Sequence, residues 1–200
     1  MSTERQKLRW AILTTGWGNS AVKAIEAFNE GKIEESNIVL LVYENEPSGA
    51  AEVAKNSGIE ALQFQRSSFD SQLSYQKSLC NELKKRDIDY IFMLGFKYII
   101  REEMLNIYPN KIINIHPSLF PSFLATKTAI QDALDYGVKI SGVTTHIIDN
   151  KIDEGIIICQ EPVVFNENDT FETLYPQFIE KGKKATINTM KLIYKQHFRD

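Results

Sequence analysis

The sequence has few of the residues that build disulfide frameworks and metal centres. It contains two cysteines, Cys80 and Cys159, and three histidines, His116, His146 and His197. The cysteines lie far apart and lack the spacing of a zinc site, so we expect free thiols, a reducing cytoplasmic location and no metal ion.

Two further absences limit the classes of partner. Acidic and basic residues are interspersed without a Lys/Arg cluster, and the net charge is −3, so nucleic acid is not expected as a partner. No apolar run approaches the length of a membrane span, and the N-terminal segment MSTERQKLRW is polar, so we expect no membrane association.

The order of apolar and amphipathic segments predicts one α/β domain. Of the 200 residues, 43% are hydrophobic, which is enough for one buried core. Alternating strand-length and helix-length segments predict a single-domain, mostly parallel twisted sheet with helices on both faces, a Rossmann-like fold. We expect strands at 8–15, 37–43, 61–64, 90–94, 111–115, 142–148 and 155–165. We expect helices at 20–30, 49–57, 70–86, 101–106, 125–136 and 170–194. The domain is expected to span 8–194, between polar tails at 1–7 and 195–200.

Residues 14–25, TTGWGNSAVKAI, join the first predicted strand to the first predicted helix. The pattern G-x-G-x-x-A fits a loose dinucleotide-binding fingerprint, and Glu44 lies near the position of the acid that binds a ribose. The loop equally suits a lone phosphate at the start of a helix capped by Asn19 or Ser20, or a tight turn without a ligand. This segment alone does not choose between the three.

The segment IINIHPSLFPSF, residues 112–123, ends a predicted strand with polar side chains. Asn114 and His116 alternate with an apolar residue, so in extended backbone they point to the same side. Pro117 stops the strand and leaves His116 at the carboxyl edge of the sheet, where ligands bind in open α/β folds. A strand end whose polar groups cap neighbouring backbone is the alternative interpretation.

The segment THIIDNKIDEG, residues 145–155, adds Asp149 and Asp153 in a loop between two predicted strands. An amide donates to an oxygen that becomes negative, an imidazole moves a proton, and a carboxylate stabilises a charged imidazole. Asn114, His116 and an aspartate of this loop therefore suit acyl-group transfer. A solvated turn is the alternative for the loop.

These two segments and the glycine loop resemble the glycinamide ribonucleotide transformylase family over residues 8–164; the matching runs are NIHPSLFPSF and SGVTTHIIDNKIDEGIIICQEPV. The resemblance implies transfer of a formyl group from 10-formyltetrahydrofolate to a primary amine. Glycinamide ribonucleotide, in purine biosynthesis, is the expected acceptor. The protein is then a monomer or homodimer that acts on two small-molecule substrates, without a metal.

The resemblance also assigns site residues by position. Asn114 corresponds to the amide that polarises the formyl carbonyl, His116 to the catalytic histidine, and Asp153 to the aspartate that supports it. The acceptor phosphate is expected to contact Gly18, Asn19 and Ser20. The folate is expected to contact Gln72, Lys97, Tyr98, Ile99, Ile100, Asn114 and Asp149.

The chain departs from the family pattern at positions that bear on both substrates. Tyr98 and Gln72 stand where arginines are common, and Ala125 replaces a common glycine. The C-terminal helix lacks the histidine of a Glu-His pair that helps to hold the acceptor, which makes an amino sugar, free or nucleotide-linked, the second candidate acceptor.

Three further interpretations differ from formyl transfer to an amine. The chain could bind a nicotinamide dinucleotide through the glycine loop, bind a metabolite without catalysis, or hydrolyse the formyl-folate with water in place of the amine. His146, among apolar residues, is either structural or a support for a catalytic neighbour.

Overall fold

Residues 7–199 are described by a computed structural model of the protein. Residues 1–6 of the expected N-terminal tail and residue 200 of the expected C-terminal tail lie outside the described residues.

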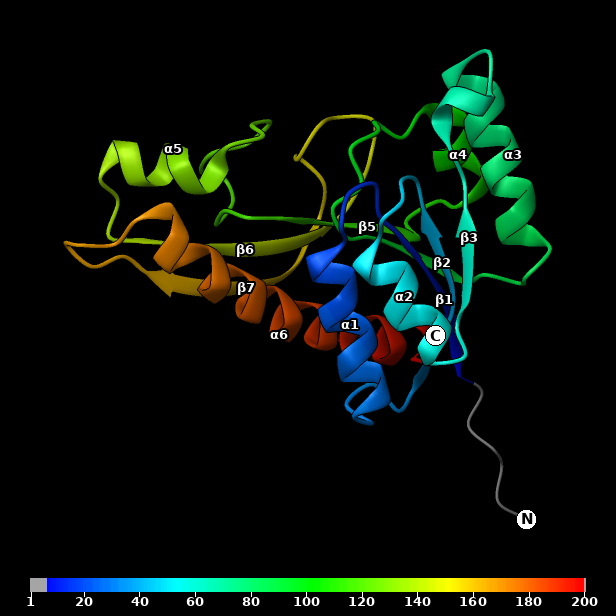
Figure 1. Cartoon of the computed structure of the whole chain (residues 1–200), viewed down its shortest axis with the longest axis horizontal. Coiled ribbons are helices and arrows are strands. Elements are labelled where there is room, and N and C mark those ends of the chain that lie inside the picture. The colour runs from blue at the N-terminus through cyan, green and yellow to red at the C-terminus, as the bar shows by residue number, and fades with distance from the viewer. Residues whose placement is uncertain (1–6, 200) are drawn as a thin grey trace.

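A seven-stranded sheet forms the centre of the molecule (Figure 1). Its strands are β1 (Leu8–Leu13), β2 (Ser36–Tyr43), β3 (Glu60–Gln63), β4 (Tyr90–Met93), β5 (Ile112–His116), β6 (Ile140–Ile147) and β7 (Ile157–Val164). They lie in the order β3-β2-β1-β4-β5-β6-β7. Strands β1 to β5 pair in parallel, whereas β6 runs antiparallel to β5 and to β7. The predicted mostly parallel α/β sheet is therefore confirmed.

The helices lie close to where the sequence predicts them. They are α1 (Asn19–Asn29), α2 (Gly49–Asn56), α3 (Gln72–Lys84), α4 (Glu102–Ile107), α5 (Ala129–Tyr136) and α6 (Phe171–His197). A short 3-10 helix at Arg66–Ser68 was not predicted. Helix α6 extends to His197, beyond the expected end at 194, so the first residues of the expected C-terminal tail are helical.

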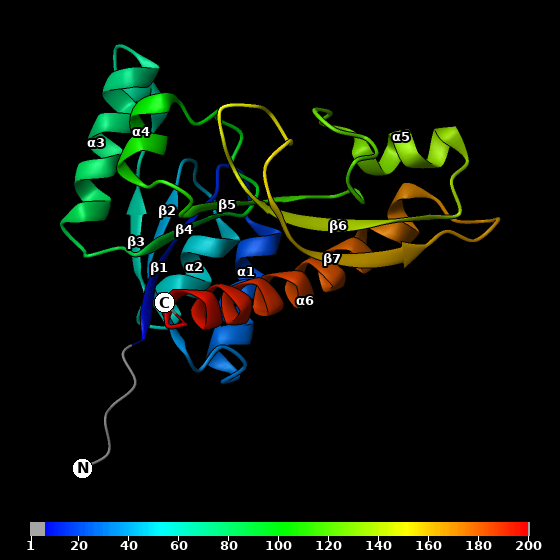
Figure 2. The same cartoon turned by 180° about the vertical axis from the view of Figure 1, so that it is seen from behind.

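Different helices cover the two faces of the sheet, as Figures 1 and 2 show from opposite sides, and successive side chains of β1 point to opposite faces. Trp10 and Ile12 belong to the core beneath α1, α2 and the C-terminal half of α6. Ala11 and Leu13 belong to the core beneath α3 and α4. Burying one large apolar side chain stabilises a fold by about 1.5–3 kcal/mol, so each face holds its helices firmly.

A third core joins the antiparallel end of the sheet to α5 and the beginning of α6. Val143 of β6 and Val163 of β7 pack there with Ile130 of α5 and with Leu174 and Phe178 of α6. Because α6 contacts this core at one end and the core beneath α1 at the other, it ties the two halves of the sheet together.

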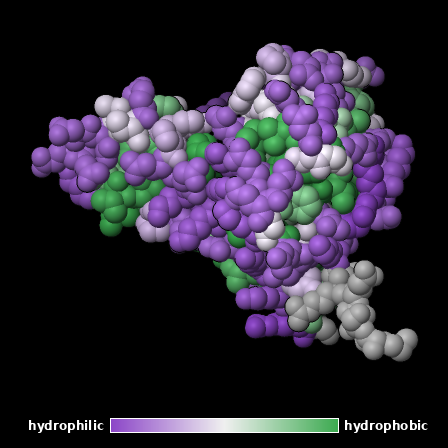
Figure 3. Space-filling model, turned by 60° about the horizontal axis from the view of Figure 1, so that its bottom comes forward, coloured by the Kyte–Doolittle hydropathy of each residue, from purple (hydrophilic) through white to green (hydrophobic). Residues whose placement is uncertain are grey.

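On the face of the molecule shown in Figure 3, hydrophilic residues cover most of the surface and exposed hydrophobic residues form separate groups between them. Within residues 7–199, no helix has both the length and the apolar character needed to cross a membrane.

Candidate active site

Strand β5 brings the two polar residues of its end to the same side of the sheet. Its neighbours fix the register: Asn114 pairs with Met93 of β4 on one side and with His146 of β6 on the other. His116 is the last residue of the strand and is 6% exposed. The sequence predicted this placement from the alternation of side chains, and the paired strands hold it rigidly.

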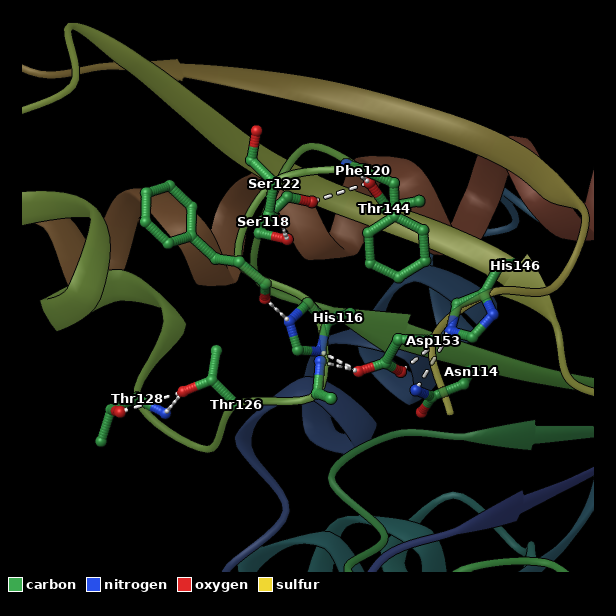
Figure 4. Close-up of polar contacts among 12 residues, drawn as sticks. Asn114, His116, Ser118, Phe120, Ser122, Thr126, Thr128, Thr144, His146 and Asp153 are labelled. Atoms are coloured by element: carbon green, nitrogen blue, oxygen red, sulfur yellow. Dashed lines mark hydrogen bonds and ion pairs between the residues drawn. The ribbon is translucent and has the colours of Figure 1, made fainter. Parts of the chain in front are cut away.

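Asp153 reaches this strand end from the loop between β6 and β7. Its Oδ2 lies 3.3 Å from Nδ1 of His116 and accepts the backbone N–H of Ala125 at 3.0 Å (Figure 4). Asp153 has a φ of +55°, a left-handed conformation that costs free energy in a residue other than glycine. Two residues on, Gly155 passes so close to β6 that a Cβ there would lie 1.7 Å from the carbonyl oxygen of Ile147. The conformation of Asp153 and the close approach of Gly155 to β6 therefore fix the path of this loop over the end of β5.

Both nitrogens of the His116 ring face hydrogen-bond acceptors. Nδ1 faces the Asp153 carboxylate, and Nε2 lies 2.9 Å from the carbonyl oxygen of Phe123 (Figure 4). Neither acceptor can donate, so a ring that carries hydrogen on both nitrogens satisfies both of them. The geometry thus accommodates a charged imidazolium.

The environment of Asp153 keeps its carboxyl group ionised. Burial raises the pKa of Asp153, but contact with His146, the charge of His116 and the N–H of Ala125 lower it more, so the pKa lies below its usual value. A carboxylate that stays charged at neutral pH can support a positive charge on His116.

His146 joins this group, a role that the sequence left open between two interpretations. It is 1% exposed, and its Nε2 lies 3.6 Å from Oδ1 of Asp153 and 3.3 Å from the Asn114 amide. The face of its ring packs against Phe120, with the ring centroids 4.9 Å apart. The sequence gives no signal for this role, because it follows from the pairing of β6 with β5, which places His146 opposite Asn114.

A cavity of about 160 Å³ opens beside Asn114 and Asp153, between the segment after β4 and the loop after β6. Its lining is formed by Met93, Phe96, Lys97, Tyr98, Ile99, Ile100, Asn114, His146, Ile148, Asp149, Asn150, Lys151, Ile152 and Asp153. All the residues predicted to contact a folate lie on it except one. Gln72 does not line the cavity; its amide donates to the backbone carbonyl of Ile99 and so supports the wall from behind.

At the rim of this cavity, Glu44 is engaged by two of the predicted folate residues. Its Oε2 lies 2.8 Å from Nζ of Lys97, and the Tyr98 hydroxyl donates a hydrogen bond to its Oε1. Burial raises the pKa of Glu44, and the bonds from Lys97 and Tyr98 lower it more, to below its usual value. Glu44 therefore positions Lys97 and Tyr98, and its carboxylate is not free for a ribose.

The glycine loop turns into α1 through Gly18, whose φ is +86°. A Cβ on Gly18 would lie 2.6 Å from Cβ of Ala50, so only glycine fits. No side chain caps α1, so the expectation of a cap by Asn19 or Ser20 is wrong. The helix begins at Asn19, which places that side chain in the first turn, where its amide donates to the hydroxyl of Tyr175 in α6 at 3.0 Å.

A second cavity, of about 190 Å³, lies between the start of α1 and α6. It is lined by Ser20, Gly95, Ile115, Pro117, Ile130, Val143, Tyr175, Phe178, Ile179 and Gly182. No charged side chain is among them. Two charged residues of this part of α6 lie near charged residues of α1 and of its C-terminal end: Glu180 lies 3.9 Å from Nζ of Lys23, and Nζ of Lys183 lies 3.2 Å from Glu30.

Among residues 7–199, no group of three or more His, Cys, Asp and Glu side chains is arranged to hold a metal ion. Asn114, His116 and Asp153 are polar side chains that the structure brings to this strand end. Together they offer hydrogen-bond donors for an oxygen that becomes negative and a proton relay backed by a carboxylate.

The sequence of the chain is similar to those of known transferases. A family model described as formyl transferase matches residues 8–190. A phosphoribosylglycinamide formyltransferase of Bacillus subtilis (strain 168) is 30% identical over 83% of this chain and 84% of that protein. A chloroplastic phosphoribosylglycinamide formyltransferase of Arabidopsis thaliana is 28% identical over 99% of this chain and 69% of that protein.

Solved structures of such proteins have the same fold. Glycinamide ribonucleotide transformylase 1 from Symbiobacterium toebii has a TM-score of 0.90 at 28% identity, covering 95% of this chain and 89% of that chain. Phosphoribosylglycinamide formyltransferase from Bacillus halodurans has a TM-score of 0.87 at 30% identity, covering 94% of this chain and 96% of that chain. Sequence and fold are thus similar over most of each chain.

Proposed function

Because the chain belongs to the formyl transferase family, we propose that it transfers a formyl group from 10-formyltetrahydrofolate to the amine of glycinamide ribonucleotide. The observation that carries this proposal is that Asn114 and Asp153 line the first cavity and that Nδ1 of His116 lies 3.3 Å from Oδ2 of Asp153. The names of the similar proteins support the acceptor, since they are phosphoribosylglycinamide formyltransferases.

The reaction proceeds by attack of the neutral acceptor amine on the formyl carbon. The carbonyl oxygen becomes negative and accepts hydrogen bonds from Asn114 and from protonated His116, whose Nε2 exchanges the Phe123 carbonyl for this oxygen. Asp153 stabilises the imidazolium from the Nδ1 side. His116 gives a proton to the departing folate nitrogen, and the attacking nitrogen loses a proton that restores the charge of His116. Each transfer is direct or passes through water.

The first cavity is the site we propose for the folate. Phe96 and the backbone of 97–100 form one wall for the pterin, and the loop that carries Asp149 forms the other. Lys97, whose side chain is 56% exposed at the rim, supplies positive charge for the carboxylates of the folate tail. It takes over in part from the arginine that Tyr98 replaces. The Tyr98 hydroxyl bonds to Glu44, and Nζ of Lys97 must leave its 2.8 Å contact with the same carboxylate to reach the folate tail.

The second cavity and the glycine loop are the site we propose for the acceptor. The first N–H groups of α1 favour a phosphate near Gly18, Asn19 and Ser20. The apolar wall beside them, with Tyr175 and no charged side chain, keeps an amino sugar as a second candidate acceptor, because a sugar ring needs hydroxyl and ring-face contacts rather than ion pairs.

A cytoplasmic location and a monomer or homodimer are part of the same proposal. Cys80 and Cys159 are free thiols, which suits a reducing compartment. Burial raises the pKa of the Cys80 thiol to about 11, so this residue stays in its unreactive, protonated form.

The test is an assay of tetrahydrofolate release from 10-formyltetrahydrofolate over a panel of acceptors. The panel contains glycinamide ribonucleotide, free and nucleotide-linked amino sugars, and a reaction without an amine. We expect turnover with glycinamide ribonucleotide and almost none without an amine. Turnover without an amine would indicate hydrolysis. Turnover with amino sugars and not with glycinamide ribonucleotide would identify an amino sugar as the acceptor.

Two variants make this assay specific. His116→Ala should lose most of the turnover, whereas His197→Ala, at the exposed end of α6, should retain it. Binding of NADH, followed by its fluorescence in the same preparation, tests the dinucleotide interpretation. Tight NADH binding together with no formyl transfer would overturn the proposal.

A further inference from the structure

His146 occupies a position from which it can set the orientation of the Asn114 amide. The two residues face each other in paired strands β6 and β5, with His146 Nε2 3.3 Å from Nδ2 of the Asn114 amide (Figure 4). The same Nε2 lies 3.6 Å from Oδ1 of Asp153. The other ring nitrogen, Nδ1, is buried and has no hydrogen-bond partner among the described residues.

These surroundings determine which nitrogen of His146 carries the hydrogen in the neutral ring. The Asp153 carboxylate only accepts, so a lone pair on Nε2 would face a negative charge. A hydrogen on Nδ1 would be a buried donor without an acceptor, which costs more than leaving a lone pair there. Both arguments place the hydrogen on Nε2.

A hydrogen on Nε2 fixes the Asn114 side chain in turn. With Nδ2 of Asn114 at the recorded position, two donors would face each other, so the amide must turn by 180° and place its oxygen toward Nε2. The NH₂ group then points away from His146. Asn114 lines the first cavity, so its two N–H donors are presented to that cavity.

We propose that His146 is a positioning residue, which acts through its Nε2–H to hold the Asn114 amide with its NH₂ group toward the formyl oxygen. The effect on catalysis rests on the proposed function. The tautomer of His146 and the orientation of Asn114 do not. With the opposite tautomer, the amide oxygen would face the formyl oxygen, and the two negative ends would repel.

The tautomer can be measured without any substrate. The ¹⁵N chemical shifts of the ring nitrogens distinguish a neutral imidazole with hydrogen on Nε2 from one with hydrogen on Nδ1. We expect His146 to have hydrogen on Nε2 and its signal to vanish in a His146→Gln variant, which assigns it. Hydrogen on Nδ1 would overturn the inference, whether or not the protein transfers formyl groups.

Activity measurements test the consequence with a matched pair of variants. His146→Leu removes the donor, and we expect kcat to fall about 10- to 100-fold, short of the 10²–10³-fold expected when an oxyanion donor is lost. The KM values of both substrates should change little. His146→Gln offers an amide N–H near the position of Nε2 and should recover most of kcat. If His146→Leu lowers the thermal midpoint and His146→Gln does not recover kcat, then His146 is only a packing residue.

A double-mutant cycle separates an effect through Asn114 from one through Asp153. If His146 acts by orienting Asn114, then His146→Leu has little further effect on kcat in an Asn114→Ala background. If it acts only on the carboxylate, the loss persists in that background and disappears in an Asp153→Asn background. The second pattern would overturn the inference while leaving the proposed formyl transfer intact.

Discussion

The imidazole of His116 and the carboxylate of Asp153 lie 3.3 Å apart, measured from Nδ1 to Oδ2, although one ends strand β5 and the other belongs to the loop after β6. Two constraints produce this distance. The β4 and β6 neighbours fix β5, and the left-handed turn at Asp153 directs its side chain back over the strand end. The contact between the two side chains is therefore set by the fold, as the proposed proton relay requires.

Removing the Asn114 amide should slow the reaction more than it weakens binding. Asn114→Ala deletes a donor that acts on the negative oxygen of the transition state, and we expect kcat to fall about 10²–10³-fold. Steady-state kinetics with saturating formyl-folate measure this effect. Asn81→Ala, on the exposed side of α3, is the matched control and should leave kcat unchanged. Full activity in Asn114→Ala would remove this residue from the mechanism.

The charge of Asp153 should contribute to stability at neutral pH and not in acid. Because burial and its neighbours leave the pKa of Asp153 below its usual value, the stabilisation is present above about pH 4 and is lost as the pH falls through the folded-state pKa. Asp153→Asn should lower the free energy of unfolding by about 1.5–3 kcal/mol at pH 7, the range for hydrogen bonds to charged groups.

Urea unfolding at pH 7 and near pH 3 checks the sign of this effect. The difference between wild type and Asp153→Asn should shrink as the solution becomes acidic. Asp135→Asn, which removes a charge from the exposed face of α5, controls for the change in net charge. A difference that grows toward pH 3 would contradict the depressed pKa.

The sequence predicted the parts of the site that follow from strand periodicity. The alternation around Asn114 and His116 determines their shared side, and Pro117 determines where the strand stops, so both residues could be placed at the sheet edge. The position of Asp153 came only from the resemblance to a family. Nothing local indicates that a residue other than glycine adopts a φ of +55° there.

Contacts between distant segments are what the sequence could not supply. Asn19 suits a helix cap by type, but its amide bonds to Tyr175 in α6, because α1 begins one residue earlier than a cap at that position would require. Gln72 suits a ligand contact but bonds to the Ile99 carbonyl. The hydrogen-bond partners of these side chains depend on which residues the packed helices bring close together. Short-range sequence patterns do not determine this.

Two glycines with similar backbones should respond differently to alanine. Gly31 has a φ of +70° with open space around a Cβ, so Gly31→Ala tests conformational strain alone, and we expect a loss of about 1 kcal/mol. Gly18→Ala adds a contact of 2.6 Å with Ala50, so it should lose more than Gly31→Ala.

Urea unfolding compares the stabilities of these two variants, and acceptor kinetics separate the local effect. Because Gly18 shapes the start of α1, Gly18→Ala should also raise KM for the acceptor, while Gly31→Ala leaves it unchanged. Equal losses of stability in the two variants would mean that α2 moves away from the glycine loop at no cost.

Tyr175 should contribute to binding of the acceptor and not of the folate. Its ring is held by stacking on Phe171, with centroids 5.4 Å apart, and its hydroxyl accepts a hydrogen bond from Asn19. The hydroxyl hydrogen is thus available to an acceptor bound in the second cavity, which Tyr175 lines. Tyr175→Phe should therefore raise KM for the acceptor roughly 2- to 10-fold, the effect of one neutral hydrogen bond.

The folate cavity is lined by other residues, so KM for 10-formyltetrahydrofolate should stay constant in Tyr175→Phe. Tyr136→Phe is the matched control, because it makes the same substitution at a tyrosine that is 82% exposed at the end of α5 and does not line the second cavity. A parallel rise in both KM values would mean that the substitution disturbs the sheet edge as a whole. The Tyr175 hydroxyl links α6 to the glycine loop. An unchanged acceptor KM in Tyr175→Phe would mean that this hydroxyl does not bind the acceptor and that the glycine loop alone holds it.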